Sequence, residues 1–302
     1  MQNPMQNPMQ KPPLHIIAGP TAGGKTAAAI KLAKQINGEV VSADSMQIYK
    51  YMNIGTAKPT IEEMDGIPHH MLDVADPADY FSVANYTMLA TKAINDIISR
   101  GKTPILAGGT GFYINAVIHG TSFTELTEQE EKLHETDNIL REQYTKLAAE
   151  KGAAFLYSKL QAADPEYAKI VHPNNIKKVA RALSFCKTTG KLFSAYNAQQ
   201  KKSEAKYDIN FTLLTLLRDE LYDRINRRVI KMWAAGLPDE VSHLLSKGYH
   251  PQLTSMQGIG YKETIPYVNG EITKDEAIAQ IQQNTRNYAK RQETWFRHQV
   301  RV

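Results

Sequence analysis

The feature that most constrains this chain is a glycine-rich segment near its N-terminus, Gly19-Pro20-Thr21-Ala22-Gly23-Gly24-Lys25-Thr26. An apolar run over residues 14–18 precedes it and an alanine-rich helical pattern follows, which is the strand, loop and helix setting of a phosphate-binding loop. In such a loop, backbone N–H groups and the helix N-terminus bind phosphate oxygens. Lys25 adds a positive charge, and the Thr26 hydroxyl can hold Mg²⁺. We therefore expect a ligand that carries a diphosphate or a triphosphate.

Three candidate site residues follow other predicted strands. Asp44, Thr110 and Arg218 come after strands predicted over residues 39–43, 103–107 and 209–217. Because the carboxyl ends of parallel strands meet at one edge of a sheet, these side chains are expected beside the phosphate-binding loop. Asp44 is a candidate magnesium ligand, general base or helix N-cap. The turn around Thr110 is again glycine-rich, and we expect its backbone N–H groups and its hydroxyl to bind the same ligand.

Two adjacent histidines, His69 and His70, lie in a strand predicted over residues 68–74. Adjacent strand residues point to opposite faces, so the pair is not expected to bind one metal ion. We favour a structural role for at least one of them.

The single cysteine, Cys186, excludes an internal disulfide and a multi-cysteine zinc site. It lies in a helical pattern, and we expect it to be buried as a small apolar residue rather than to act as a nucleophile. No apolar run approaches the roughly 20 residues of a membrane-spanning helix, and residues 1–13 contain no apolar signal core. We expect a disordered lead-in over residues 1–13 and a cytoplasmic protein with no membrane partner.

Residues 121–205 differ from the rest of the chain in their sequence pattern. Helical patterns over residues 128–151, 156–161 and 175–188 follow one another without strands. This block interrupts an α/β pattern, so we expect an inserted helical subdomain within a core made of residues 14–120 and 206–302. Asn174 or Asn175 is expected to cap the helix that places Lys177 and Arg181 on one face.

The C-terminal end is basic. Residues 284–302 contain five arginines and lysines and one acidic residue, with aromatic side chains at Tyr288, Trp295 and Phe296. Cations interleaved with aromatic rings suit an unstacked nucleic acid, while a solvated helix face with core-facing Trp295 and Phe296 is the alternative. Earlier in the chain, Arg224 and Arg228 are four residues apart and could clamp a phosphate or pair with nearby acids.

The kind of transfer follows from where the acidic side chain lies. Enzymes that transfer the terminal phosphoryl group of ATP or GTP usually have an aspartate after a strand like residues 105–107, where this chain has glycines. Asp44 follows a different strand, where it could take a proton from a nucleophile that attacks carbon and expels diphosphate. The sequence thus favours alkyl transfer, with a small-molecule kinase as the alternative.

Six segments, in chain order, resemble the bacterial tRNA dimethylallyltransferase family: Gly19-Pro20-Thr21-Ala22-Gly23-Gly24-Lys25-Thr26, Asp44-Ser45-Met46-Gln47-Ile48-Tyr49, Ile54-Gly55-Thr56-Ala57-Lys58-Pro59, Gly108-Gly109-Thr110-Gly111-Phe112-Tyr113, Gly258-Ile259-Gly260-Tyr261-Lys262-Glu263 and Thr285-Arg286-Asn287-Tyr288-Ala289-Lys290-Arg291-Gln292. The match spans essentially the whole chain after residue 18. Within the inserted segment, Arg181 keeps its family position, whereas Asn175, Lys178 and Ser184 depart from the residues that the family often has there.

The resemblance implies a P-loop NTPase-like parallel sheet flanked by helices, with an inserted helical subdomain that binds tRNA. It implies transfer of a dimethylallyl group from dimethylallyl diphosphate to the exocyclic amino nitrogen of the adenosine 3′ of the anticodon, in tRNAs reading codons that begin with U. Asp44 would be the general base, Thr110 and Arg218 would lie on the diphosphate side, and residues 19–26 would bind the diphosphate with Mg²⁺ at Thr26. We expect a monomer that binds the tRNA anticodon stem-loop.

The resemblance also implies a set of contacts to the tRNA or its target adenine: Ser45, Met46, Gln47, Gly55, Thr56, Lys58, Arg181, Gly258, Tyr261, Lys262, Arg286, Lys290 and Arg291. An adenylate isopentenyltransferase, which modifies free AMP, ADP or ATP, is the nearest alternative, although it would need neither the helical insertion nor the basic end. A non-catalytic RNA-binding protein is disfavoured because Lys25, Thr26 and Asp44 are all present.

Overall fold

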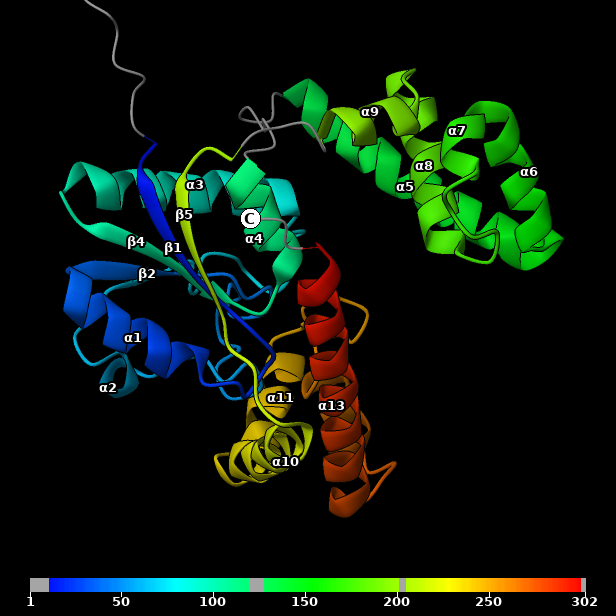
Figure 1. The fold of residues 1–302 in the computed structure, drawn as a ribbon. Helices are drawn as coiled ribbons and strands as arrows, with labels where there is room; N and C mark the ends of the chain where they lie inside the picture. The colour runs from blue at the N-terminus through cyan, green and yellow to red at the C-terminus, as the bar shows by residue number, and fades with distance from the viewer. Residues whose placement is uncertain (1–10, 120–127, 201–204, 300–302) are drawn as a thin grey trace, which may run out of the picture. The chain divides into compact units, whose positions relative to one another are not determined.

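A five-stranded parallel sheet forms the core of the larger part of the chain (Figure 1). Its strands are β1 (Pro13–Ala18), β2 (Gly38–Ser42), β3 (His69–His70), β4 (Thr103–Gly108) and β5 (Asp208–Leu213), in the spatial order β3-β2-β4-β1-β5. Because β1 pairs with both β4 and β5, the phosphate-binding loop that follows β1 leaves from the interior of the sheet. The parallel sheet and its flanking helices confirm the predicted α/β fold class.

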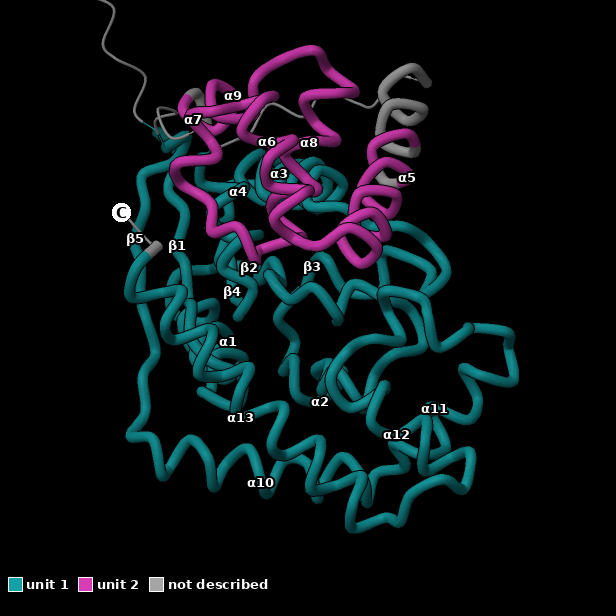
Figure 2. The backbone as a smooth tube through the Cα atoms, turned by 90° about the vertical axis from the view of Figure 1, so that its right-hand side faces the viewer, with its two compact units in different colours: residues 1–120, 205–302 teal, residues 121–204 magenta. Residues whose placement is uncertain are grey.

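The computed structural model describes residues 11–119, 128–200 and 205–299, and Figure 2 colours its two compact units. One unit contains residues 1–120 and 205–302, and the other contains residues 121–204. Residues 1–10 of the predicted lead-in lie outside the described residues. The lead-in ends earlier than predicted, because the Pro12 carbonyl accepts a hydrogen bond from the Asp208 N–H at 2.9 Å and Pro13 begins β1.

Helices cover both faces of the sheet in the larger unit. Helix α1 (Lys25–Ile36) packs on one face, while α3 (Val83–Ser99) and α4 (Gly111–His119) pack on the other (Figure 1). The remaining helices of this unit are α2 (Ile61–Met64), α10 (Arg218–Ala234), α11 (Leu237–Ser246), α12 (Tyr261–Val268) and α13 (Lys274–Gln299). Within the described part of the chain, no helix is both long and apolar enough to cross a membrane.

Two strands are shorter than predicted. The sequence predicts a strand over residues 209–217, but β5 ends at Leu213, which pairs with Ala18 at the end of β1. Since the chain turns into the phosphate-binding loop at Gly19, β1 offers no further partner. The strand predicted over residues 68–74 is reduced to β3, because Met71 and Asp73 have positive φ angles of 66° and 55° that take the backbone out of the extended region.

Glu39 on β2 is a buried acid held by two cations and a histidine. Its carboxylate accepts hydrogen bonds from both terminal nitrogens of Arg100, at 2.6 and 2.7 Å, and from Lys102 Nζ at 2.7 Å. His70 Nε2 lies 2.8 Å from the same group. The hydrogen bonds from Arg100 hold the pKa of Glu39 well below its usual range. His70 therefore has a structural role, as the sequence suggested for one histidine of the pair.

Replacing Glu39 with Gln should lower the free energy of unfolding by about 2 kcal/mol at pH 7, the usual scale for hydrogen bonds to a charged group. Because folding lowers this pKa, the stabilisation is present above the unfolded value of 4.5 and is lost as the pH falls below it. Urea unfolding from pH 7 to pH 3 should therefore show the two proteins converging. Asp96→Asn removes only an exposed partner of Arg100 and should change stability very little; a constant gap for Glu39→Gln at all pH values would contradict the assignment.

The smaller unit consists of five helices in its described residues: α5 (Glu128–Lys151), α6 (Ala153–Ala163), α7 (Pro165–Ala168), α8 (Ile176–Thr189) and α9 (Phe193–Gln200). Leu156, Leu160, Val179 and Leu183 are buried in its own apolar core. The Asn175 side chain caps α8 by accepting a hydrogen bond from the Lys178 N–H at 3.3 Å, as predicted.

Cys186 packs against the core of the smaller unit but is only half-buried, less than the sequence predicted. Burial raises the pKa of its thiol, which disfavours the nucleophilic thiolate.

Candidate active site

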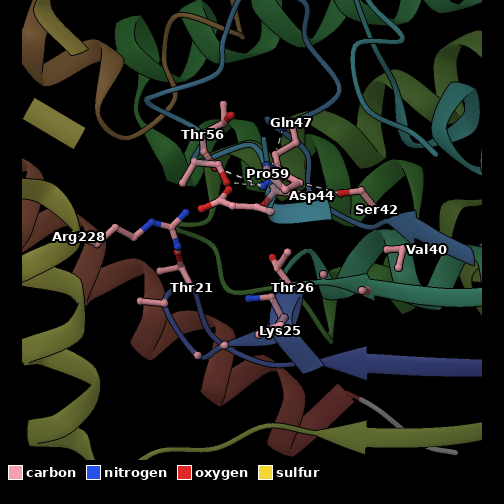
Figure 3. Close-up of a pocket in the computed structure, with 18 of the residues that line it drawn as sticks. Thr21, Lys25, Thr26, Val40, Ser42, Asp44, Gln47, Thr56, Pro59 and Arg228 are labelled. Carbon is pink, nitrogen blue, oxygen red and sulfur yellow. Dashed lines mark hydrogen bonds between the residues drawn. The ribbon is translucent and has the colours of Figure 1, made fainter. Parts of the chain in front are cut away.

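Two cavities adjoin at the carboxyl ends of the strands in the larger unit. The larger cavity, of about 790 Å³, is lined by the phosphate-binding loop, and the smaller one, of about 320 Å³, is lined by residues of α10, α12 and α13. Thr21, Asp44, Thr56 and Arg228 line both cavities, and Figure 3 shows their side chains in the larger one. These four residues mark where a ligand in one cavity would meet a ligand in the other.

The phosphate-binding loop is folded as its sequence predicts. Gly24 has a φ of 85°, a left-handed conformation that suits glycine at the start of α1. The Gly23 N–H and Lys25 Nζ both donate hydrogen bonds to the Pro20 carbonyl, at 3.1 and 2.7 Å. Residues 21–27 line the larger cavity, and the Lys25 ammonium is thus held over the loop that would enclose a phosphate.

Burial lowers the pKa of Lys25 to about 8. The positive charge of Arg228 lowers it further, whereas the negative charge of Asp44 opposes both effects. A bound phosphate would restore the charged form of this ammonium, because opposite charges stabilise each other at close range.

Asp44 lies just after β2, and one of its carboxylate oxygens is fixed by the backbone. Oδ1 accepts hydrogen bonds from the N–H groups of Met46 at 2.9 Å and Gln47 at 3.4 Å, so Asp44 does act as the cap of the following turn. Among the described residues, the second oxygen has no hydrogen bond. Asp44 therefore has a fixed orientation and one oxygen that can accept a proton or bind a cation.

Helix α10 brings a stripe of cations to the larger cavity, consisting of Arg224, Arg227, Arg228 and Lys231. Arg224 and Arg227 are paired with Glu220 and Asp223 one turn earlier in the helix. Arg228 is half-buried, and its Nη1 lies 3.5 Å from the Thr21 hydroxyl, to which it donates. Both alternatives for the arginine pair are thus realised, since Arg224 pairs with an acid and Arg228 remains beside the phosphate-binding loop.

Arg218 is not where the sequence places it. It is the first residue of α10, it is exposed, and its guanidinium lies 5.1 Å from the centre of the Tyr222 ring. It lines neither cavity. Because β5 ends four residues before the predicted end of the strand, Arg218 falls beyond the sheet edge where Asp44 lies.

The glycines of the second glycine-rich turn allow close packing, and Gly108 also lines the larger cavity. A Cβ at Gly108 would collide with the Ala43 carbonyl, and one at Gly111 would collide with the Trp295 ring. The Thr110 N–H is donated to the Ala43 carbonyl at 3.1 Å and is not available to a ligand. The Thr110 hydroxyl accepts a hydrogen bond from the Ser45 N–H at 3.2 Å and so positions the segment that follows Asp44.

Comparison with known proteins places these features in a family. A family model described as IPP transferase matches residues 47–299. The chain belongs to this family. The tRNA dimethylallyltransferases of Bacillus subtilis and Caldanaerobacter subterraneus are 47% and 48% identical to it, over 97% and 93% of this chain and 90% and 88% of their own lengths.

Solved structures agree with the assignment. The tRNA delta(2)-isopentenylpyrophosphate transferase of Staphylococcus epidermidis is 42% identical, with a TM-score of 0.67, and the match covers 97% of this chain and 92% of that protein. A eukaryotic dimethylallyltransferase acting on tRNA is 31% identical, with a TM-score of 0.77, and the match covers 94% of this chain and 70% of that protein.

Most of the residues predicted to contact the acceptor line the smaller cavity of this IPP transferase family member: Ser45, Met46, Gly55, Thr56, Gly258, Tyr261, Lys262 and Arg291. Tyr288, which the sequence suggested for stacking, lines it too. Burial raises the pKa of Tyr288 to about 12, so its phenol stays protonated. Gln47 instead lines the larger cavity, and its amide nitrogen donates to the carbonyls of Thr56 and Ala57 at 3.3 and 3.2 Å.

Two predicted RNA contacts are held by other parts of the protein. The side chain of Lys58 is only 5% exposed, and its ammonium binds the Tyr49 carbonyl at 2.8 Å and the Asp73 carboxylate at 2.6 Å. Arg286 donates to the side chains of Asn226 at 2.6 Å and Gln283 at 2.7 Å. Neither residue lines either of the two cavities described above, and Lys58 is a structural residue of its loop.

The other predicted cations are exposed. Lys290 and Arg291 project from α13, with the guanidinium of Arg291 5.7 Å from the centre of the Tyr288 ring. Phe296 is buried in the core and Trp295 packs against it, so the alternative of core-facing aromatics holds for both. In the smaller unit, Arg181 is exposed, with its guanidinium 5.5 Å from the centre of the Phe193 ring.

Gln292 is a buried residue of the site that the sequence singled out only as the end of a matching segment. Its Oε1 accepts a hydrogen bond from the Thr21 N–H at 2.8 Å, and its Nε2 donates to the Gly109 carbonyl at 2.9 Å. A Cβ at Gly109 would collide with this amide. Gln292 therefore ties α13 to both glycine-rich turns, a contact over about 270 residues that no local pattern indicates.

Proposed function

We propose that this IPP transferase family member transfers a dimethylallyl group from dimethylallyl diphosphate to the exocyclic amino nitrogen of an adenosine in tRNA. The adenosine is the one 3′ of the anticodon in tRNAs reading codons that begin with U. The observation that carries the proposal is that Asp44 lines both cavities, between the phosphate-binding loop and the residues around Tyr288. The names of the relatives support tRNA as the acceptor and a dimethylallyl group as the group transferred.

In the proposed reaction, the amino nitrogen attacks C1 of the dimethylallyl group while the bond from C1 to the diphosphate oxygen breaks. The electron pair of that bond leaves with the diphosphate. Asp44 accepts the proton that the nitrogen loses, through the oxygen that its backbone contacts leave unpaired. Lys25 and Arg228 stabilise the charge that develops on the leaving group. The adenine must leave the base stack to reach this carboxylate.

We propose Mg²⁺ as the cofactor, with the Thr26 hydroxyl as its ligand in the larger cavity. No group of three or more His, Cys, Asp or Glu side chains in the described residues could hold a metal ion on its own. This donor set fits Mg²⁺, which keeps several water ligands and is commonly held by substrate phosphates with one or two protein oxygens. When bound, the ion would neutralise part of the charge of the diphosphate.

Transfer of label from isotopically marked dimethylallyl diphosphate tests the function. The acceptors, compared in the presence of Mg²⁺, are an unmodified tRNA reading a UNN codon, AMP and ATP. Label in tRNA alone supports the proposal. Label in a free nucleotide would instead indicate an adenylate isopentenyltransferase, and label in none of the acceptors would contradict prenyl transfer to adenine and lead to an assay for ATP-dependent phosphorylation.

We propose that the tRNA contacts the exposed cations of α13 and, in the smaller unit, those of α8, namely Lys177, Lys178 and Arg181. Replacing Lys290 and Arg291 together with Ala should weaken tRNA binding and lower the slope of log affinity against log salt by about 1 to 2, since each lost phosphate contact lowers it by roughly 0.7 to 0.9. Pyrophosphate affinity should change little. Lys31→Ala, an exposed lysine on α1, serves as the control; an unchanged salt slope in the double variant would remove this surface from the tRNA interface.

A further inference from the structure

The carboxylate of Glu240 accepts four hydrogen bonds. Oε2 accepts from the N–H groups of Asn53 at 2.9 Å and Ile54 at 2.8 Å. Oε1 accepts from the Gly55 N–H at 3.1 Å and from the Tyr261 hydroxyl at 2.6 Å. One charged side chain thus satisfies three consecutive backbone donors, which would otherwise need water or another acceptor.

Glu240 lies in the first turn of α11, where an acid is often explained by the positive end of the helix. Its hydrogen bonds instead reach a segment about 185 residues earlier in the chain. The helix that carries it is anchored by the buried side chains of Leu237, Val241 and Leu244. The carboxylate therefore belongs to an anchored helix, and it binds a loop that has no regular secondary structure.

The loop it holds, residues 53–59, lines both cavities. Gly55 and Thr56 line the smaller cavity, and Thr56, Ala57 and Pro59 line the larger one. Tyr261 lies against Gly55 so closely that a Cβ there would collide with its ring. Glu240 fixes both partners of this contact, because it holds the Gly55 N–H and the Tyr261 hydroxyl through the same oxygen.

Other residues hold the rest of the loop. Gln47 donates to the carbonyls of Thr56 and Ala57, and Lys58 binds the Asn53 side chain at 2.9 Å. The phosphate-binding loop has separate anchors in Gln292 and Arg228. Loss of the Glu240 carboxylate should therefore free the N–H groups of residues 53–55 and the Tyr261 hydroxyl without releasing the phosphate-binding loop.

We propose that Glu240 is a positioning residue for the acceptor side of the active site: it fixes the wall that Gly55 and Tyr261 form in the smaller cavity, against which the acceptor nucleoside binds. The assignment of this cavity to the acceptor rests on the proposed function. Glu240 itself lines neither cavity and acts only through the groups it holds.

The test is Glu240→Gln, which keeps the size of the side chain but turns one acceptor oxygen into a donor facing N–H groups. Amide hydrogen exchange of the full chain without substrates should become about tenfold faster or more at residues 53–55, because hydrogen bonds to a charged group are lost. The KM for acceptor tRNA should rise about tenfold, while kcat and the Kd for pyrophosphate stay within about twofold. A residue that only stabilises the fold would not raise the KM for acceptor tRNA while leaving the Kd for pyrophosphate unchanged.

Two further variants sharpen the test. Asp239→Asn removes an exposed acid from the same helical turn without touching the loop and should leave exchange and KM unchanged. Tyr261→Phe removes one of the four hydrogen bonds and should raise the KM less than Glu240→Gln does. Unchanged exchange at residues 53–55 in Glu240→Gln, or equal weakening of tRNA and pyrophosphate binding, would overturn the proposal. Because the exchange measurement needs no substrate, a wild-type protein that transfers no label would count against the proposed function alone.

Discussion

Replacing Asp44 with Asn should lower kcat by about two to four orders of magnitude, the usual contribution of general acid–base catalysis. Asn keeps an oxygen that can accept hydrogen bonds from the N–H groups of Met46 and Gln47, so the turn should survive. Its amide group cannot take the proton from the attacking nitrogen. Pyrophosphate should bind as well or better, because the substitution removes a negative charge that lines the same cavity and would repel the diphosphate. Single-turnover transfer to tRNA and separate binding measurements check both expectations.

The control for this experiment is Glu62→Gln. Glu62 is an exposed acid on α2 that lines neither cavity. Its substitution should leave kcat unchanged. A loss of less than threefold in Asp44→Asn would take Asp44 out of the role of base. Pyrophosphate binding that weakens along with turnover would show that Asp44 acts in donor binding rather than in proton transfer.

The parts of the site that the sequence predicts are those specified by local contacts. The phosphate-binding loop is determined within a few residues, by the left-handed glycine at Gly24 and by the hydrogen bonds of Gly23 and Lys25 to the Pro20 carbonyl. The turn after Asp44 is likewise closed by contacts two and three residues away. Such short-range geometry follows from residue type and spacing alone.

The errors arise where a distant partner decides the outcome. Arg218 was placed at the sheet edge because residues 209–217 are apolar, but the length of β5 depends on where β1 stops pairing. The resemblance implied that Lys58 contacts the tRNA or its adenine, yet the partners of its ammonium include Asp73, 15 residues further on. The glycines around Thr110 fit either an anion cradle or close packing, and their close neighbours, Ala43 for Gly108 and α13 for Gly109 and Gly111, are distant in sequence.

The residues that the sequence missed have the same explanation. Glu240 and Gln292 bind backbone groups about 185 and 271 residues away along the chain. An isolated Glu in a first helical turn and an isolated Gln in a long helix carry no spacing signal. Arg228 was found in part, because its distance of four residues from Arg224 is a local pattern, but its contact with Thr21 was not.

Replacing Lys25 with Met should weaken pyrophosphate binding by about 30- to 100-fold, the equivalent of losing roughly 2–3 kcal/mol from a charged hydrogen bond to phosphate. The Met side chain keeps much of the apolar stem but cannot bind the Pro20 carbonyl or a phosphate oxygen. Titration calorimetry at constant ionic strength measures the effect. Lys31→Met, on an exposed position of the same helix, should bind pyrophosphate as the wild type does.

The pH dependence gives a second readout of the same group. Because burial lowers the pKa of Lys25 to about 8, the ammonium loses its proton as the pH rises through that value, and pyrophosphate affinity should fall between pH 7 and pH 9. The profile of Lys25→Met reports the protonation of pyrophosphate itself, so the difference between the two proteins isolates Lys25. Lys25→Arg keeps its charge over this range and should lose the wild-type dependence. If pyrophosphate affinity changed with pH in the same way in the wild type and in Lys25→Met, the protonation of Lys25 would not control the affinity.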